Sequence, residues 1–396
     1  MKTFVVHSTS TTSPATPTSW IDPKRHWWLL GLVVPTLPII AGGLAAATGL
    51  GIFWWLGPIV LYGVMPLLDL SLGRDRENPP EEIVPQLNDD RYYRWCTFLY
   101  VPLQFTSLVL ACAIWSSGRL STFAALGLAA TVGSVGGVAI NTAHELGHKH
   151  PAVEQWLAKI ALAQTGYGHF VVEHNRGHHV HVSTPQDPAS SRLGQSLYEF
   201  LPRTVIGSVR SAITIERDRR RRAGTHFLSP RNDVLNAWAL TVVLFGALVA
   251  AFGLTILPWL AIQAIIGFLM LEVVNYVEHY GLLRAQKENG RYERCQPQHS
   301  WNANNVASNL ALYQLQRHSD HHANPTRRYQ CLRNFDDVPQ LPTGYAAMMA
   351  LALVPPLWRK VMDPRVIAFY DGDVTRAHIH PRHRDRVLAR YGVDPS

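Results

Sequence analysis

Apolar residues in this chain gather into long stretches without charge, separated by segments crowded with Arg, Asp and His. The stretches 27–48, 95–117 and 120–143 contain no charged residue. A helix needs roughly 20 apolar residues to cross a bilayer, so each stretch predicts a transmembrane helix. A further stretch, 52–72, is interrupted only by Asp69 and predicts another.

The longest uncharged stretch, 234–271, is about twice the length of one crossing at ~1.5 Å of rise per residue. Phe252, Gly253 and Pro258 lie near its middle, where Pro disrupts a helix because it lacks an N–H donor. The stretch therefore predicts two helices joined by a turn. We expect an all-α fold: a polytopic membrane protein with six transmembrane helices in three hairpins.

Lys and Arg are distributed unevenly between the two sides of this predicted bundle. They gather before the first helix, between the second and third, and between the fourth and fifth, where 217–222 reads RDRRRR, whereas the turns on the other side carry only Arg119. Positive residues mark the cytoplasmic side, so both termini are expected in the cytoplasm. The first apolar stretch is longer than a signal-peptide core, and we expect it to be retained.

The same pattern divides the chain into five regions. Ser, Thr and Pro dominate 8–19, which predicts a mobile tail. The stretches 156–172 and 345–358, the second ending in Pro355 and Pro356, are too short or too interrupted to span and suit interfacial or re-entrant helices. The expected regions are a mobile cytoplasmic N-terminal tail (1–26), transmembrane helices one to four (27–143), a cytoplasmic region with an interfacial helix (144–233), helices five and six (234–278) and a cytoplasmic C-terminal region (279–396).

Composition excludes several classes of protein. The chain is 47% hydrophobic and 16% charged, which excludes a disordered protein and a small disulfide scaffold. Its four cysteines form no CxxC pair, so they build neither a thiolate zinc cluster nor a rubredoxin-type iron site, and we expect reduced thiols. The net charge of +8 beside membrane segments favours a cytoplasmic face over nucleic-acid binding.

Histidine carries the candidate chemistry, because nine of the nineteen histidines stand in four clusters. Residues four apart share a helix face, and so do residues at spacings of three and four. We therefore expect each cluster with several members to present its rings on one face. The predicted topology places all four clusters on the cytoplasmic side, which predicts one joint site in a His-rich helical catalytic cap. The clusters are His144 and His148; His174, His178 and His179; His279; and His318, His321 and His322.

The number of imidazoles indicates two metal ions, since one ion such as zinc takes about four ligands. Imidazole binds iron, copper, zinc and nickel, and a nitrogen-rich redox site without thiolates fits a pair of irons best. No haem or flavin is expected. Carboxylates beside the clusters should orient the ring N–H groups and balance the metal charge. The candidates are Glu145, Glu173, Asp187, Glu278 and Asp320.

Several features have a second interpretation. HELGH at 144–148 alone is typical of zinc proteases, with Glu145 as general base, but an intramembrane zinc protease leaves seven clustered histidines unexplained. A metal-transport protein would carry its histidines along the spans rather than at one end. Trp54 and Trp55 either line a substrate channel or belong to an interfacial aromatic belt.

Charged and polar residues outside the clusters also have two readings. The 217–222 run, with Arg327 and Arg328, either docks an acidic partner or contacts anionic lipid headgroups. The remaining histidines near the clusters are expected to have polar roles, and the C-terminal HIHPRH segment is expected at the surface. These are His150, His169, His181 and His299 near the clusters, and His378, His380 and His383 in that segment.

Four motifs carry a resemblance to a known family. HELGHK, EHNRGHH, NYVEHYG and LQRHSDHHANPTRRYQ resemble the four boxes of the membrane-bound alkane 1-monooxygenases, or alkane hydroxylases. These enzymes are related to xylene monooxygenase and to membrane fatty acid desaturases. The resemblance runs from about the first predicted helix to just beyond Asp337. Desaturases share three of the boxes, whereas NYVEHYG and the context of the last motif are typical of the alkane group.

The resemblance implies a non-haem diiron enzyme that hydroxylates the terminal methyl of medium or long n-alkanes with O2 and electrons from rubredoxin. It places the iron ligands on the same nine histidines. Because CxxC is absent, rubredoxin would be a separate chain, reduced by a rubredoxin reductase, with Lys149, Arg327 and Arg328 as docking candidates. The implied location is the bacterial inner membrane. A fatty acid desaturase or a xylene-type hydroxylase with the same diiron chemistry is the alternative.

An alkane offers no group for hydrogen bonding, so its recognition must come from apolar burial, at about 0.8 kcal/mol per CH2, and from channel shape. We expect a channel between the helices that opens to lipid and ends at the metal pair. Gly127, Gly133, Gly136 and Gly137 on the fourth helix would permit close helix approach.

Overall fold

The computed structural model describes residues 2–6 and 18–394. Within them, six helices are long and apolar enough to cross a membrane, which confirms the six spans and makes the chain a multi-pass membrane protein. The first span joins η1 and α1, the second joins η2, α2, η3 and α3, and the sixth joins η6 and α12. The bounds of the spans are Trp27–Thr48, Gly51–Leu72, Arg91–Ser116 (α5), Thr122–Gly147 (α6), Asp233–Phe252 (α11) and Leu254–His279.

Short turns connect the spans in three hairpins, as predicted. Gly49 (φ +74°) ends α1 and Gly253 (φ +84°) ends α11, and both have the left-handed φ that glycine adopts without steric cost. Long segments follow the second, fourth and sixth spans. We call the end of the bundle that carries His144 and His279 the His end. Three of the spans are built from several helical segments. The segments of the first, second and sixth spans are Trp27–Thr36 (η1), Leu37–Thr48 (α1), Gly51–Trp55 (η2), Leu56–Ile59 (α2), Val60–Val64 (η3), Met65–Leu72 (α3), Leu254–Ile256 (η6) and Leu257–His279 (α12).

Helix α6 is the centre of the bundle. In its most apolar 18 residues, 89% are buried, whereas the share for the second span is 11%. Glycines let α12 approach α6 closely, as expected. A Cβ on Gly133 would lie 2.7 Å from the Cβ of Ile266, and one on Gly137 would lie 2.7 Å from the Cε of Met270. The close contact fixes the two helices that carry His144 and His279 relative to each other.

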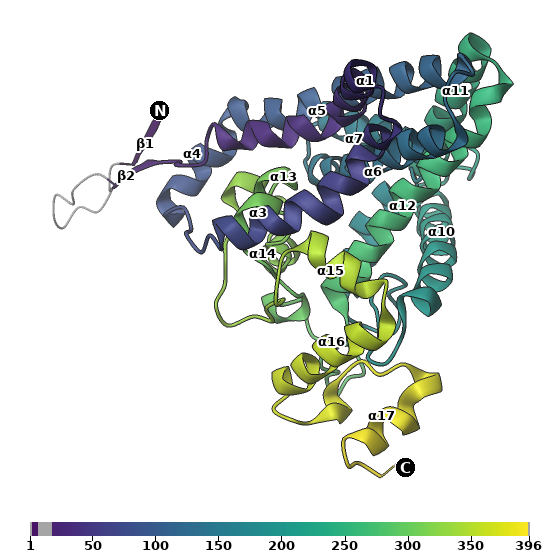
Figure 1. Cartoon of the computed structure of the whole chain (residues 1–396). Coiled ribbons are helices and arrows are strands. Elements are labelled where there is room, and N and C mark those ends of the chain that lie inside the picture. The colour runs from purple at the N-terminus through teal and green to yellow at the C-terminus, as the bar shows by residue number, and fades with distance from the viewer. Residues whose placement is uncertain (1, 7–17, 395–396) are drawn as a thin grey trace.

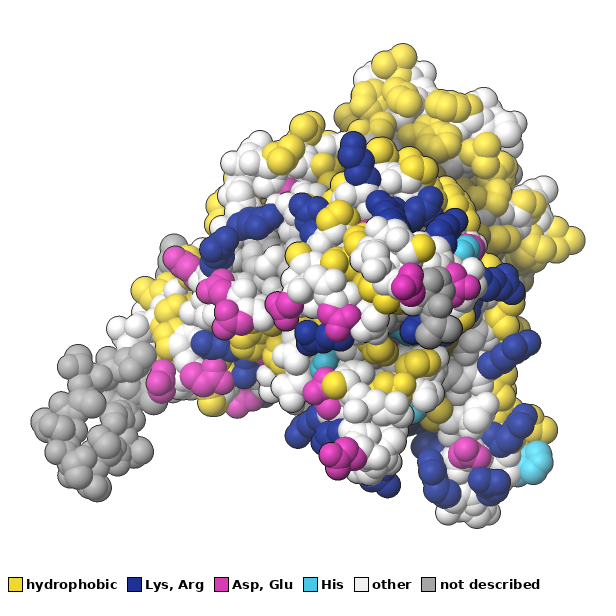
Figure 2. All heavy atoms as spheres, turned by 90° about the horizontal axis from the view of Figure 1, so that it is seen from below, with side chains coloured by type: hydrophobic (Ala, Val, Ile, Leu, Met, Phe, Trp, Pro, Cys, Tyr) yellow, Lys and Arg dark blue, Asp and Glu magenta, His cyan; other side chains and the backbone are white. Residues whose placement is uncertain are grey.

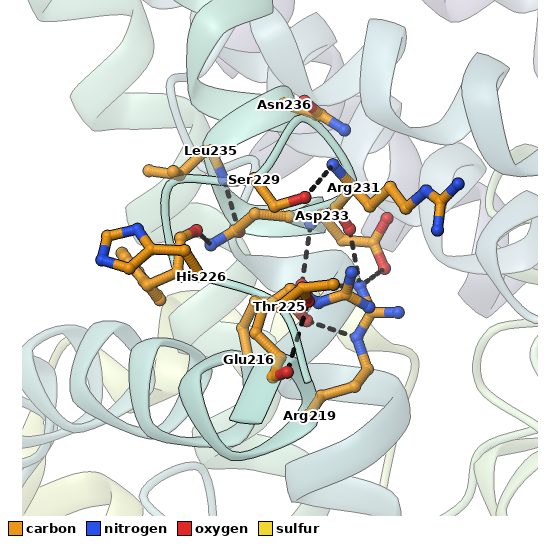
Figure 3. Close-up of polar contacts among 12 residues, drawn as sticks. Glu216, Arg219, Thr225, His226, Ser229, Arg231, Asp233, Leu235 and Asn236 are labelled. Carbon is orange, nitrogen blue, oxygen red and sulfur yellow. Dashed lines mark hydrogen bonds and ion pairs between the residues drawn. The ribbon is translucent and has the colours of Figure 1, made fainter. Parts of the chain in front are cut away.

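Between the fourth and fifth spans, the chain forms α7 (Ala152–Ala163), the turn segments α8 (Phe170–Glu173), η5 (His174–His178) and α9 (His179–His181), and the long helix α10 (Leu197–Arg222). The predicted interfacial segment, 156–172, covers most of α7, the turn after it and most of α8. Figure 3 shows how the end of α10 is tied to the start of α11: Arg219 bridges Glu216, at 2.6 Å, and Asp233, at 2.7 Å. Part of the 217–222 run therefore has a structural role at this corner.

The C-terminal region packs against the His end and beyond it. In Figure 1, the yellow helices α16 and α17 form the part of the molecule farthest below the membrane spans. Pro355 and Pro356 begin α16 rather than ending the preceding segment, because proline suits the first turn of a helix. The helices are α13 (Val306–Ala311), α14 (His318–Ala323), α15 (Tyr345–Ala352), α16 (Pro355–Phe369) and α17 (Arg384–Arg390).

The N-terminal region differs from the prediction of a mobile tail. Strands β1 (Thr3–Val6) and β2 (Thr18–Ile21) form an antiparallel hairpin in which Thr3 pairs with Ile21. Phe4 is buried in the core, and Lys2 forms an ion pair with Asp90 at 3.0 Å. These contacts hold the hairpin against the His end, and the rest of the Ser/Thr/Pro stretch lies outside the described residues.

Short 3-10 turns and one helix complete the described chain. The four cysteines, all within the described residues, are free thiols, as expected. Figure 2, viewed from below Figure 1, shows hydrophobic side chains gathered along one side and charged side chains scattered over the rest, as a membrane protein requires. The remaining elements are η4 (Glu81–Ile83), α4 (Val84–Asp89), η7 (Pro297–His299), η8 (Tyr329–Cys331), η9 (Val374–Arg376) and η10 (Pro381–His383).

Candidate metal centre

The nine clustered histidines, far apart in sequence, meet at the His end. They form two neighbouring groups, and within each group the ligand nitrogens all lie within 4.8 Å of one another. Two nitrogens on opposite sides of one ion, each about 2.1 Å from it, would lie about 4.2 Å apart, so each group matches the size of one coordination sphere. The first group is His144, His148, His174, His179 and His321, and the second is His178, His279, His318 and His322.

The second His cluster departs from the predicted helical spacing. The prediction placed His174 and His178 on one face, but the structure separates them into different groups and pairs His174 with His179. The reason is that 174–178 forms a π-helix, whose hydrogen bonds join residues five apart. One turn of π-helix thus lets a single short segment supply rings to both groups.

The fourth His cluster is also divided between the groups. On the short helix α14, His318 and His322 lie one turn apart and share the second group, with their Nε2 atoms 2.9 Å apart. His321 points to the first group, where its Nε2 atom is 2.8 Å from that of His144. Only His144 and His148 follow the predicted pairing completely, since α6 is a regular α-helix to Gly147.

The ring nitrogens have the chemistry of metal ligands. The buried Nε2 atoms of His148 and His279 have no hydrogen-bond partner, although buried polar atoms in proteins are nearly always paired. Within the second group, the Nε2 atoms of His178 and His322 approach to 3.3 Å. So dense a set of nitrogens, some without partners, fits two metal ions that accept their lone pairs.

Electrostatics keeps these rings neutral, which a metal ligand requires. Burial lowers the pKa of His148 and His174 well below the usual value near 6.5, and the charges that neighbouring rings would carry lower it further. The same causes lower the pKa of His179, His321 and His322. At neutral pH the rings therefore present lone pairs rather than protons.

Two of the five expected carboxylates contact the rings. Asp187 lies 2.9 Å from the Nδ1 of His178, and Glu278 lies 3.2 Å from the Nε2 of His318. Burial would raise the pKa of Asp187, but the His178 ring and the Ser190 hydroxyl outweigh it and lower the pKa below its usual range. Asp187 is therefore an anion that can orient His178, as carboxylates do beside metal-binding histidines.

The other three carboxylates differ from that expectation. Glu145 accepts from the backbone N–H of Tyr329 and pairs with Lys149 at 3.1 Å. Glu173 is buried, and its Oε1 atom has no hydrogen-bond partner within the described residues. Asp320 accepts from Asn324 at 2.7 Å and from Arg327 at 3.0 Å, and these contacts close the turn after α14. Glu145 and Asp320 each hold a neighbouring segment in place rather than a ring.

The expected docking cations are mostly turned inward. Lys149 is buried, pairs with Glu145 and donates to the carbonyl of Arg327 at 2.9 Å. Arg328 is buried against Glu154, with contacts of 2.8 and 3.1 Å. Lys149 and Arg328 therefore offer no free charge to a partner, and only Arg327 of the three remains partly accessible.

The remaining histidines have the roles expected near the clusters but not at the C-terminus. His169 contacts the Ser208 hydroxyl, and His299 contacts Glu293 at 3.1 Å. His378 and His380 were expected at the surface and are buried. Their backbone hydrogen bonds to Leu193, at 2.7 and 3.0 Å, enclose this segment against the loop before α10.

Three apolar cavities that share lining residues lie in a row from the side of the bundle to the metal groups. An outer groove of about 470 Å³ lies between the first two spans and α13, and Val60 and Met65 line both it and a middle cavity. Leu61 and Met270 line both the middle cavity and an inner cavity. His144, His174, His318 and Glu278 form the end of the inner cavity.

Trp54 and Trp55 lie away from these cavities, near the end of the bundle opposite the metal groups. Trp55 packs on Gly127, where a Cβ would lie 2.5 Å from its ring, and donates to the carbonyl of Phe123 at 3.2 Å. Gly127 and His144 are about 25 Å apart along α6 at 1.5 Å of rise per residue.

The residues of the cavity wall are the part of the site that the sequence analysis missed. Asn141 and Asn275 line the inner cavity, one helical turn before His144 and His279. The available signal was a polar residue inside an apolar span, which is costly in a membrane and usually functional.

Comparisons with known proteins agree with this geometry. The model of the fatty acid desaturase family matches residues 121–352. Alkane 1-monooxygenase of Acinetobacter baylyi is 45% identical over 95% of this chain and 93% of its own, and alkane 1-monooxygenase 1 of Alcanivorax borkumensis is 47% identical over 97% and 95%. The hydroxylase component of xylene/toluene monooxygenase of Pseudomonas putida is 28% identical over 78% and 81%. These matches exclude the zinc-protease interpretation. The chain belongs to the alkane 1-monooxygenase family, within the wider family of fatty acid desaturases.

Proposed function

We propose that this protein is a non-haem diiron monooxygenase that hydroxylates the terminal methyl of medium- or long-chain n-alkanes. The observation that carries the proposal is that an apolar path from the outer face of the bundle ends at the two His groups. The relatives named alkane 1-monooxygenase support the same activity. One oxygen atom of O2 enters the C–H bond and the other leaves as water, with two electrons from a reductant and two protons.

Iron fits the donor set better than zinc does. The first group offers five imidazoles and the second four, whereas a zinc site is typically satisfied by four ligands in a closed tetrahedron. Imidazoles without thiolates suit iron, and a sphere of four or five such ligands leaves positions open. When bound, the iron pair would supply the activation of O2 and the cleavage of the C–H bond.

The protein's own contribution is burial, orientation and dryness. Each CH2 of an alkane moved from water into the cavities is worth about 0.8 kcal/mol, so chain length sets affinity. Substrate from the lipid would enter by the outer groove and pass Met65 and Leu61 toward the inner cavity. Because the inner cavity ends at His144 and His318, an end-on alkane would present its terminal methyl there.

Electrons would come from rubredoxin, a separate chain reduced by a rubredoxin reductase. The partly exposed Arg327, which pairs with Asp320 and Glu81 at 3.0 Å, is the remaining docking candidate of the three predicted cations. We place the protein in the bacterial inner membrane, with both termini and the His end in the cytoplasm, on the basis of the positive-inside distribution.

Trp54 and Trp55 would limit chain length if a long alkane extends beyond the middle cavity toward the far end of α6. Replacing Trp55 with Ser removes the ring that packs on Gly127 and should extend the accepted chain. The measurement is relative turnover of n-alkanes from octane to hexadecane. An unchanged profile would assign Trp55 to the aromatic belt.

The proposed function is tested with purified protein, reductant and O2, supplied in parallel with octane, a fatty acyl substrate and a methylarene. We expect 1-octanol as the main product and about two irons per chain. Formation only of a double bond in the acyl chain would identify a desaturase instead, and preferential oxidation of the methylarene would identify a xylene-type hydroxylase. One zinc and no iron per chain would overturn the diiron site.

A further inference from the structure

The wall of the inner cavity is apolar except for three histidine rings of the metal groups, Glu278 and two carboxamides. Asn141 lies on α6, three residues before His144, and Asn275 lies on α12, four residues before His279. Residues at these spacings are neighbours on a helix. Each carboxamide therefore lies one turn from a candidate metal ligand, on the side from which substrate would arrive.

Internal hydrogen bonds fix the orientation of both carboxamides. The Nδ2 of Asn141 donates to the carbonyl of Leu312 at 2.7 Å, and the Nδ2 of Asn275 donates to Glu272 at 3.1 Å. Both partner oxygens are acceptors, so each must face an NH2 group and not a carbonyl oxygen. The carbonyl oxygen of each carboxamide accepts no hydrogen bond from the described residues, so it remains an acceptor for a ligand in the cavity, beside the second N–H of the NH2 group.

Glu272 is itself held firmly, which makes the orientation of Asn275 rigid. It accepts from Tyr167 at 2.6 Å and from Thr204 at 2.7 Å, besides Asn275. An ionisable group buried within a membrane span is costly and usually serves a function. An alkane cannot use either carbonyl acceptor, because it has no polar hydrogen. A primary alkanol can, since its hydroxyl donates one.

We propose that Asn141 and Asn275 form a hydroxyl-binding subsite for primary alkanols beside the metal groups. The alkanol chain occupies the apolar cavities, and its O–H donates to the carboxamide oxygens at their inner end. This inference rests on the proposed function and extends it from the alkane to its hydroxylated product. The subsite holds the product after it forms, so alkanols compete with alkanes for the same cavity.

The test compares Asn141→Leu and Asn275→Leu with the control Gln104→Leu. Leucine keeps the approximate shape of the side chain and removes the acceptor. Gln104 is also a buried carboxamide, but it donates to the carbonyl of Ala161 on α7 and does not line the inner cavity. Binding of 1-octanol and of n-nonane, which have equal numbers of heavy atoms, is measured by calorimetry on unreduced protein in nanodiscs.

Losing one buried hydrogen bond should weaken 1-octanol binding about tenfold in each variant relative to the control. The affinity for n-nonane should be unchanged or higher. Equal 1-octanol affinity in both variants and the control would overturn the subsite, and a loss in only one variant would overturn the pairing. Asn141→Leu touches no carboxylate, so it keeps the test decisive if Asn275→Leu fails to fold. Wild-type protein that forms no alkanol from octane would instead contradict the proposed function.

Discussion

Replacing Gly133 with Ala should separate the two helices that position the metal groups. The new Cβ would lie 2.7 Å from the Cβ of Ile266 and 2.9 Å from the backbone oxygen of Gln263, whereas ordinary contacts begin near 3.4 Å. Because backbone cannot rotate away, α12 must move from α6 by about 0.7 Å in a close-packed interior. That shift exceeds the roughly 0.2 Å tolerance of metal–ligand distances, and α12 carries His279.

The energetic cost follows from overpacking. Adding a methyl group to a filled interface typically destabilises a protein by about 1–3 kcal/mol, while Gly to Ala within a helix gains about 0.8–1 kcal/mol in propensity. Gly43 in α1 provides a matched control, because a Cβ there meets nothing within 4 Å. The propensity gain cancels between Gly133→Ala and Gly43→Ala, so their difference of about 1–3 kcal/mol isolates the packing cost.

The assay has two readouts on protein purified in mild detergent. Unfolding by SDS in mixed micelles, followed by circular dichroism, gives the difference in stability, and elemental analysis gives iron per chain. We expect Gly133→Ala to be less stable than Gly43→Ala and to hold less iron. Equal stability and equal iron in the two variants would refute the inference that close α6–α12 packing places the ligands.

Three further predictions address the metal groups and their support. His322→Ala should lower iron by about half and abolish hydroxylation, while His378→Ala, which removes a buried ring outside both groups, should retain iron; equal iron in the two would remove His322 from the ligand set. Lys149→Met leaves Glu145 buried without its cation and should cost about 3–5 kcal/mol of stability, most of which the double variant with Glu145→Gln should restore; additive losses in unfolding measurements would contradict the pairing. Burial holds the pKa of His148 below its unfolded value near 6.5, so the unfolded chain takes up protons first as pH falls. The metal-free protein should therefore lose up to about 1.4 kcal/mol per pH unit for this ring below about pH 6.5, and a flat thermal midpoint between pH 7.5 and 5.5 would contradict it.

The spans could be predicted from the sequence because each follows from a local property, the absence of charge over a bilayer's width. The first span, 27–48, has the predicted bounds, and the break at Gly253 lies where Phe252 and Gly253 indicated it. The set of nine histidines could also be predicted, since helical spacing and common sidedness both apply to the chain without knowledge of tertiary contacts. The topology predicts that all nine lie on one side of the bundle, and the structure shows that they meet there.

The partition of the histidines could not be predicted, because it depends on backbone geometry that spacing does not reveal. A regular helix would place His174 with His178, and only the π-helix moves His179 into that position. The roles of Lys149 and Arg328 were equally inaccessible. Their charge suggested exposure. Glu145 lies only four residues before Lys149, but that spacing does not reveal that the pair is buried, and Glu154, the partner of Arg328, comes from α7, which only the fold brings beside it.

The same glycines that bring α12 onto α6 also determine where a substrate can enter. Gly133 and Gly137 keep α12 in close contact with α6, and the inner cavity that both helices line lies toward the His end. The apolar path reaches this cavity along Val60 and Leu61 of the second span. The second span is also the least buried of the six, since only 11% of its most apolar 18 residues are buried. Tight packing at the centre and loose packing at the edge therefore serve one arrangement, in which rigid helices hold the metal ligands and the lipid-facing pair admits the substrate.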